Sequence, residues 1–106
     1  MISRFEVYLT SLDPTVGREI RKTRPAVVVS PDEMNHHLGT VVVAPMTTKG
    51  MDAPFRIPLR FRGKTGKIVL DQLRAVDKAR LVRKLGHLDP EVTTKVSATL
   101  VAMFAE

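Results

Sequence analysis

The sequence predicts a mainly β protein of the α+β type: a small antiparallel β-barrel with short helices and a C-terminal helix. Five or six strand patterns follow one another between residues 5 and 76, too closely spaced for the helical crossovers of a parallel sheet. The segment after Asp89 instead has helical spacing. With 106 residues the chain fits one domain, residues 1–106.

The first predicted strand covers residues 5–10, where Phe5, Val7 and Leu9 alternate with more polar residues. The next segment, residues 11–24, is a long loop with an Asp-Pro step and a dense cluster of charges. Loops of this length in a compact domain are commonly functional.

Two continuous β-branched runs at residues 25–30 and 40–45 predict fully buried strands. The segment between them, PDEMNHHLG, is turn-like, and MTTKGMDA after them predicts a second polar loop.

Residues 55–59 alternate again, and Pro58 marks this strand as an edge or a bulge because proline lacks an amide donor. RFRGKTGK predicts a hairpin turn into the strand KIVLDQ, and LRAV can continue the sheet.

A helix is predicted from Asp89 and Pro90, a strong helix start, and Asp77 can cap one earlier helical turn. The apolar stripe of the helix that starts at Pro90 is expected to pack against the barrel rather than to bind a partner. The stripe consists of Val92, Val96, Leu100, Met103 and Phe104.

The composition restricts the classes of function. The chain has no cysteine, which excludes disulfides and thiolate chemistry, and its three histidines lack metal-ligand spacing, so we expect no metal or other cofactor. No apolar run is long enough to span a membrane and no signal peptide is visible, so we expect a cytoplasmic protein.

The chain is basic: seventeen Lys and Arg against eleven Asp and Glu give a net charge of +6. This charge favours nucleic acid or an acidic protein as the partner; the alternative is a merely basic surface.

Arg24 is the first candidate for chemistry, because the strand that begins at Pro25 fixes its position at the end of the charged loop. A guanidinium can make two parallel hydrogen bonds to a phosphate. The alternative is a surface ion pair with Glu19.

Other candidates lie near strand ends. Thr47 and Thr48 follow the strand TVVVAP, although threonine is also ordinary turn chemistry there. Asp71, Gln72 and Arg74 offer a carboxylate, an amide and a guanidinium for reading a base, but a solvated strand end is the default interpretation.

The segments LDPTVGREIRKTRPAVVVS, VVVAPMTTK and GKIVLDQLRAVDKARLVRKLGHL together resemble the MazF/PemK family of toxin endoribonucleases in order, content and spacing. The resemblance runs from about Phe5 to Leu88. It implies an SH3-like barrel that forms a homodimer, cleaves single-stranded RNA or mRNA at short sequences, and is silenced by a cognate acidic antitoxin. It also implies metal-independent attack by the RNA 2′-hydroxyl, which leaves a 2′,3′-cyclic phosphate and a 5′-hydroxyl.

Within this resemblance, the family's catalytic groups correspond to Arg24, Thr47 and Glu19. We interpret Glu19 as the base, Arg24 as the group that stabilises the phosphorane charge, and Thr47 as a hydrogen-bond donor. The expected RNA-binding residues are Arg18, Arg21, Lys22, Thr48, Asp71, Gln72 and Arg74.

The sequence departs from some members of the family. Val69 stands where some carry an arginine, and Thr23 where some carry a histidine, so acid and base roles cannot be copied across. Two other functions remain open: a non-catalytic nucleic-acid-binding barrel, and a gyrase poison of the same fold. The presence of Glu19, Arg24 and Thr47 counts against the gyrase poison.

Overall fold

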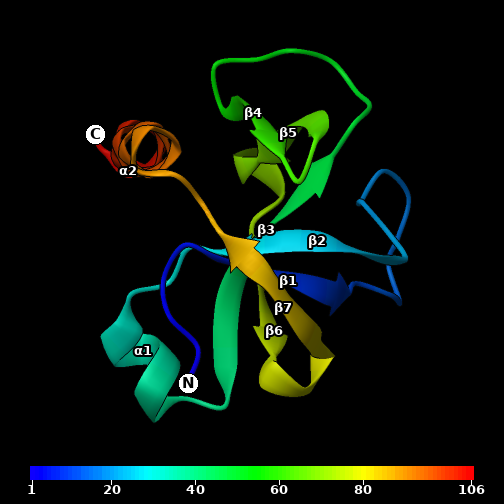
Figure 1. Ribbon diagram of the computed structural model, residues 1–106, viewed down its shortest axis with the longest axis vertical. Coiled ribbons are helices and arrows are strands. Elements are labelled where there is room, and N and C mark those ends of the chain that lie inside the picture. Colours follow the sequence, from blue (N-terminus) through cyan, green and yellow to red (C-terminus); the bar gives the residue numbers. More distant parts are fainter.

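The computed structural model describes all 106 residues, 1–106. Seven antiparallel strands form one curled sheet with two helices at its margins (Figure 1). The strands are β1 (Glu6–Ser11), β2 (Thr23–Val28), β3 (Thr40–Thr47), β4 (Arg56–Phe61), β5 (Lys64–Val69), β6 (Arg74–Asp77) and β7 (Leu81–His87). The helices are α1 (Asp32–His37) and α2 (Pro90–Phe104), and the single 3-10 turns are η1 (Leu70–Gln72) and η2 (Lys78–Arg80).

Strand β3 causes the sheet to curl, because it pairs with three other strands. One of its edges pairs with β2, while the other edge pairs first with β6 and then, at Met46 and Thr47, with β5. The order β4-β5-β3-β2-β1-β7 places the β4–β5 hairpin at one end and β7 at the other. The result is the mainly antiparallel half-barrel with a C-terminal helix that the sequence predicts.

The core confirms the buried strands expected from the β-branched runs. Val27, Val28, Val43 and Ala44 are completely buried in the central strands β2 and β3. Burial of a valine side chain contributes roughly 1.5–3 kcal/mol, so these two strands fix the centre of the fold.

Helix α2 begins where the sequence places it, at Pro90. The Asp89 carboxylate makes no capping hydrogen bond; instead its backbone carbonyl accepts from the amides of Val92 and Thr93, both at 3.0 Å. Val96 is completely buried, and Val92, Leu100 and Met103 pack against the same core. Phe104 does not pack with this stripe: it is 69% exposed in the last turn of the helix.

Two local predictions are confirmed. Pro58 lies on β4, which is the edge strand of its end of the sheet. The Asp77 carboxylate accepts a 2.8 Å hydrogen bond from the amide of Ala79 and caps η2.

Two other predictions were wrong, and one strand was not predicted. The turn-like segment after Ser30 contains the short helix α1, stabilised by buried Asn35, which bonds to the Ser30 side chain and carbonyl. Thr47 is the last residue of β3 rather than a loop residue, since it pairs with Lys67. Strand β7 was not expected at all.

No helix of the protein is long and apolar enough to cross a membrane.

Candidate functional site

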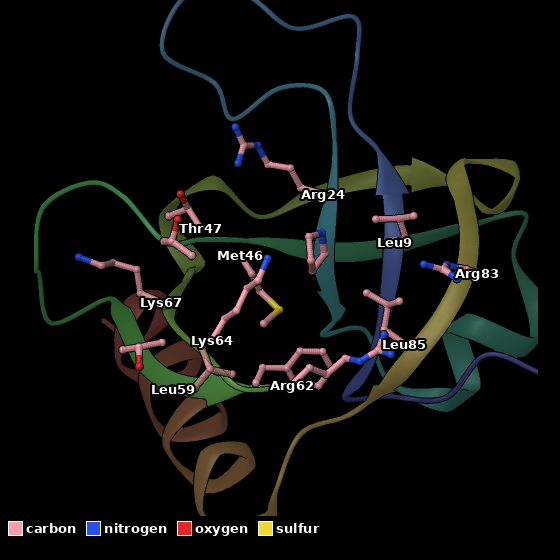
Figure 2. Close-up of a pocket in the computed structure, with 15 residues that line it drawn as sticks. Leu9, Arg24, Met46, Thr47, Leu59, Arg62, Lys64, Lys67, Arg83 and Leu85 are labelled. Carbon is pink, nitrogen blue, oxygen red and sulfur yellow. The ribbon is translucent and has the colours of Figure 1, made fainter.

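A cavity of about 490 Å³ opens between β1, β2, β7, the end of β3 and the β4–β5 hairpin (Figure 2). Its apolar lining consists of Leu9, Pro25, Met46, Leu59, Phe61 and Leu85. Five cations also line it: Arg24, Arg62, Lys64, Lys67 and Arg83. No aspartate or glutamate lies among the lining residues. A mixed apolar and cationic cavity of this kind suits a polyanion with flat apolar groups, such as a nucleic acid.

Two of the predicted catalytic residues, Arg24 and Thr47, meet in this cavity. Arg24 is half-buried on β2, opposite Thr10 of β1. Its Nε donates a 2.8 Å hydrogen bond to the carbonyl of Arg21, which turns the side chain toward the β1–β2 loop (Figure 2). The two Nη groups make no hydrogen bond within the chain, so their four N–H donors remain available for an anion.

Thr47 lies across this part of the cavity from Arg24 (Figure 2), and Thr48 is also a lining residue. The Thr47 hydroxyl oxygen accepts a 3.1 Å hydrogen bond from the amide of Lys49. Because that contact uses an acceptor site, the hydroxyl proton is free to be donated to a ligand.

Gly66 on β5 allows the close approach that places Thr47. A Cβ atom at residue 66 would lie 2.7 Å from the Thr47 carbonyl oxygen, which is closer than real Cβ contacts allow. Glycine therefore lets β5 pack directly against the end of β3.

Glu19, the third predicted catalytic residue, does not line this cavity. It is exposed in the β1–β2 loop, where its carboxylate accepts a 2.7 Å hydrogen bond from the amide of Val16. The structure thus brings together Arg24 and Thr47 but leaves Glu19 on the adjacent loop.

The predicted RNA-binding residues of the loop lie beside the main cavity rather than in it. Arg21 and Lys22 are exposed and line a second, more open cavity of about 460 Å³. Its other lining residues are Asp13, Pro14, Thr15 and Gly17. Arg18 is also exposed on this loop.

Asp71, Gln72 and Arg74 are engaged in contacts within the chain. The Asp71 carboxylate accepts two hydrogen bonds from Arg56, at 3.1 and 3.0 Å, and this contact raises the pKa of Arg56 above its ordinary value. Gln72 and Arg74 hold the backbone of the β1–β2 loop. None of the three lines the main cavity.

Sequence reasoning missed four of the five cations in the cavity. Arg62 and Lys64 flank Gly63 in the hairpin, which we interpreted only as a turn; positive φ angles at Arg62 and Gly63 are those of a two-residue hairpin loop. Lys67 donates to the Gly50 carbonyl at 2.9 Å and to the Asp52 carboxylate at 2.8 Å, which lowers the pKa of Asp52. The available signal was the concentration of cations in the hairpin, where Arg62, Lys64 and Lys67 lie within six residues.

Arg83 enters the cavity from β7, and a partly buried polar cluster holds that strand in place. Glu6 lies on β1 and is 8% exposed; its carboxylate accepts from Lys84, from the Ser3 amide and from the Tyr8 hydroxyl. Burial raises the pKa of Glu6. The hydrogen bonds, chiefly the one from Lys84, lower the pKa by more than burial raises it, so the pKa of Glu6 lies below its usual value. Burial and the contact with Glu6 raise the pKa of Tyr8. Since side chains alternate along a strand, anchoring Lys84 on one face leaves Arg83 and Leu85 to face the cavity.

The sequence and the fold both match known proteins. The family model of PemK-like, MazF-like toxins of type II toxin–antitoxin systems matches residues 3–104. Endoribonuclease EndoA of Bacillus subtilis (strain 168) is 33% identical over an aligned length of 106 residues, covering 94% of this chain and 91% of the relative.

Solved structures have the same fold. MazF of Deinococcus radiodurans matches with a TM-score of 0.85 and 24% identity, over 99% of this chain and 97% of that one. A mycobacterial endoribonuclease in complex with its cognate antitoxin matches with a TM-score of 0.81 and 23% identity, over 96% and 93% of the two chains. With a family model that covers nearly the whole sequence, this chain belongs to the PemK/MazF family of type II toxin–antitoxin toxins, a family of endoribonucleases.

Proposed function

We propose that this protein is a sequence-specific, metal-independent endoribonuclease that cleaves single-stranded RNA, including mRNA, by attack of the RNA 2′-hydroxyl. The products would carry a 2′,3′-cyclic phosphate and a 5′-hydroxyl. The observation that carries the proposal is the pairing of Arg24 and Thr47 in a cavity lined by five cations and no carboxylate.

Arg24 supports this chemistry through the geometry of its fork. Attack of the 2′-oxygen adds negative charge to the non-bridging oxygens of the phosphate. The Arg21 carbonyl fixes the Nε atom of Arg24, so the guanidinium presents its remaining donors in one orientation. Donors that are already oriented stabilise the negative charge on the phosphate oxygens in the transition state. Thr47 supplies a neutral hydroxyl donor on the opposite side of the same space.

Glu19 is our candidate for the base that removes the 2′-hydroxyl proton. Its carboxylate lies outside the cavity, so the Glu19 side chain must leave the Val16 amide and turn toward the cavity when RNA binds. Catalytic hydrogen bonds often tighten only in the substrate complex, and the contact that Glu19 makes in the free protein, with the Val16 amide, lies within the loop itself.

The remaining cations suit the flanking phosphates. Arg62, Lys64 and Arg83 lie away from Arg24 on the cavity wall (Figure 2), at positions where a single strand could continue past the cut. Thr48 lies on the rim, and Arg18, Arg21 and Lys22 extend the positive surface along the loop. We expect this surface to bind RNA in the cytoplasm as part of a homodimer.

A purified-protein cleavage assay tests the enzymatic proposal. Single-stranded RNA incubated with the protein in excess EDTA should be cut at a short recurring sequence, and sequencing the new 5′ ends should define that sequence. A non-catalytic binding barrel would shift the RNA in a gel and leave it intact. Cleavage that disappears in EDTA and returns with one divalent ion, while the RNA keeps its fold, would refute metal independence.

The partner we propose is an acidic antitoxin segment that occupies the same surface as RNA. One of the matching structures is described as an endoribonuclease in complex with its cognate antitoxin. The net charge of +6 and the exposed cations Arg21 and Lys22 fit an acidic, flexible segment.

Reversing both charges, Arg21→Glu with Lys22→Glu, should weaken the binding of antitoxin and of RNA at least about tenfold each at low salt, because phosphates and carboxylates share these cations. The matched control is Arg60→Glu with Lys95→Glu, which reverses two exposed cations outside both cavities. Equilibrium titrations measure both affinities. If antitoxin and uncleavable RNA saturate one dimer together with neither affinity altered, the shared surface is wrong while the ribonuclease assignment stands.

A further inference from the structure

The β1–β2 loop, residues 12–22, has no helix or strand of its own, yet three distant side chains hold its backbone. Gln72 accepts from the Ile20 amide at 2.7 Å and donates to the Arg18 carbonyl at 3.3 Å. Arg74 Nη1 donates to the Leu12 carbonyl at 3.0 Å. Arg80 Nη1 donates to the carbonyl of Asp13 and, at 3.3 Å, to that of Ser11. All three come from one segment, residues 72–80, and they hold both ends of the loop.

The two arginines stand out among these contacts. Arg74 and Arg80 are both half-buried, and neither forms an ion pair, although the chain contains three ion pairs between other residues. Their donors instead converge on three consecutive carbonyls, those of residues 11, 12 and 13. An arginine has five donors and no acceptor, which suits it to gather several carbonyls in one place.

These carbonyls connect to Arg24 through the loop. The Leu12 amide donates to the Lys22 carbonyl at 3.0 Å and closes the base of the loop. The adjacent Arg21 carbonyl accepts from Arg24 Nε. A displacement of residues 11–13 would therefore move the only hydrogen-bond acceptor that orients the Arg24 guanidinium.

We propose that Arg80, assisted by Arg74, is a positioning residue: it fixes the β1–β2 loop so that the Arg21 carbonyl holds Arg24 in the orientation needed for cleavage. The inference rests on the proposed ribonuclease function. It gives Arg74 a different role from the RNA contact that the sequence predicts, because its guanidinium is already bonded to the loop.

A positioning role and an RNA-contact role make opposite predictions. A lost phosphate contact weakens binding and reduces the slope of log affinity against log salt by roughly 0.7 for a single strand. A lost positioning contact leaves binding and its salt slope intact but lowers turnover, because a misplacement of about 1 Å can lower the rate by on the order of 100-fold.

The test compares Arg80→Ala and Arg80→Lys with Lys78→Ala in the full-length protein. Lys78 lies in the same helical turn, and its side chain makes no hydrogen bond or ion pair, so its removal controls for the loss of one charge. We expect Arg80→Ala to lower kcat at least about tenfold with KM within about twofold. Arg80→Lys keeps the charge and can reach one carbonyl, so it should recover part of the loss, and Lys78→Ala should match the wild type.

Hydrogen exchange without RNA gives a readout independent of activity. In Arg80→Ala the Leu12 and Val16 amides should exchange faster, while core amides such as that of Val27 keep their protection, which also establishes that the variant is folded. A raised KM, a smaller salt slope and unchanged exchange at Leu12 would overturn the proposal and make Arg80 an RNA contact. If the wild type cleaves no RNA, the proposed function fails, and exchange at Leu12 alone decides whether Arg80 orders the loop.

Discussion

Arg24→Lys is expected to lower kcat for RNA cleavage about 100-fold or more while the Kd for uncleavable RNA changes by less than about threefold. Lysine keeps the charge that attracts the phosphate, but it has no Nε to bond the Arg21 carbonyl and no planar fork. Loss of one fixed donor to a developing oxyanion typically lowers kcat by about 10²–10³. Single-turnover rates and equilibrium binding, measured on the same RNA, separate the two effects.

Arg62→Lys is the matched control for this prediction. Arg62 lines the same cavity but makes no hydrogen bond within the chain, and it lies in the hairpin away from Thr47. The same chemical change there should leave kcat within about twofold. Near-normal turnover in Arg24→Lys would remove Arg24 from the catalytic step.

The central part of the fold was predictable from the sequence for a physical reason. Val27, Val28, Val43 and Ala44 lie in uninterrupted apolar runs because β2 and β3 are covered on both faces, and such runs leave little choice of structure. Pro58 was also informative, since a residue without an amide donor is tolerated only where a strand has a free edge.

Strand β7 could not be predicted because contacts with a distant part of the chain, and not its own residue pattern, determine its structure. It pairs only with β1, in a register shifted twice. Its segment VRKLG has two adjacent cations, Arg83 and Lys84, so each face of the strand carries a charge and neither shows an apolar alternation. The buried partner of Lys84 is Glu6, nearly eighty residues earlier in the chain. Nothing local to Lys84 reveals that contact.

The candidate site also has a part that the sequence predicts and a part that it does not. The sequence predicts Arg24 just before β2 and Thr47 just after β3. Both lie inside these strands, Arg24 as the second residue of β2 and Thr47 as the last residue of β3. The cations of the hairpin and of β7 reach the same cavity only because the sheet curls. Gln72 and Arg74 have the composition of nucleic-acid contacts, and only the three-dimensional structure reveals that loop carbonyls occupy their donors.

A substrate with 2′-deoxyribose at the nucleotide before the cut should resist cleavage entirely while binding with a Kd within about threefold of the all-ribose RNA. The nucleophile in the proposed reaction is that hydroxyl: Glu19 takes its proton, and Arg24 and Thr47 stabilise the charge formed on the phosphate oxygens. Removing the hydroxyl abolishes the nucleophile together with the acid–base contribution of roughly 10²–10⁴. Deoxyribose placed one nucleotide to either side is the control and should be cut at the normal rate. The all-ribose product should carry a 2′,3′-cyclic phosphate, detectable by its mass and its resistance to phosphatase. Cleavage at the deoxyribose position at a rate near normal would mean that water attacks the phosphate, and the 2′-hydroxyl mechanism would then be wrong even though the protein remains a nuclease.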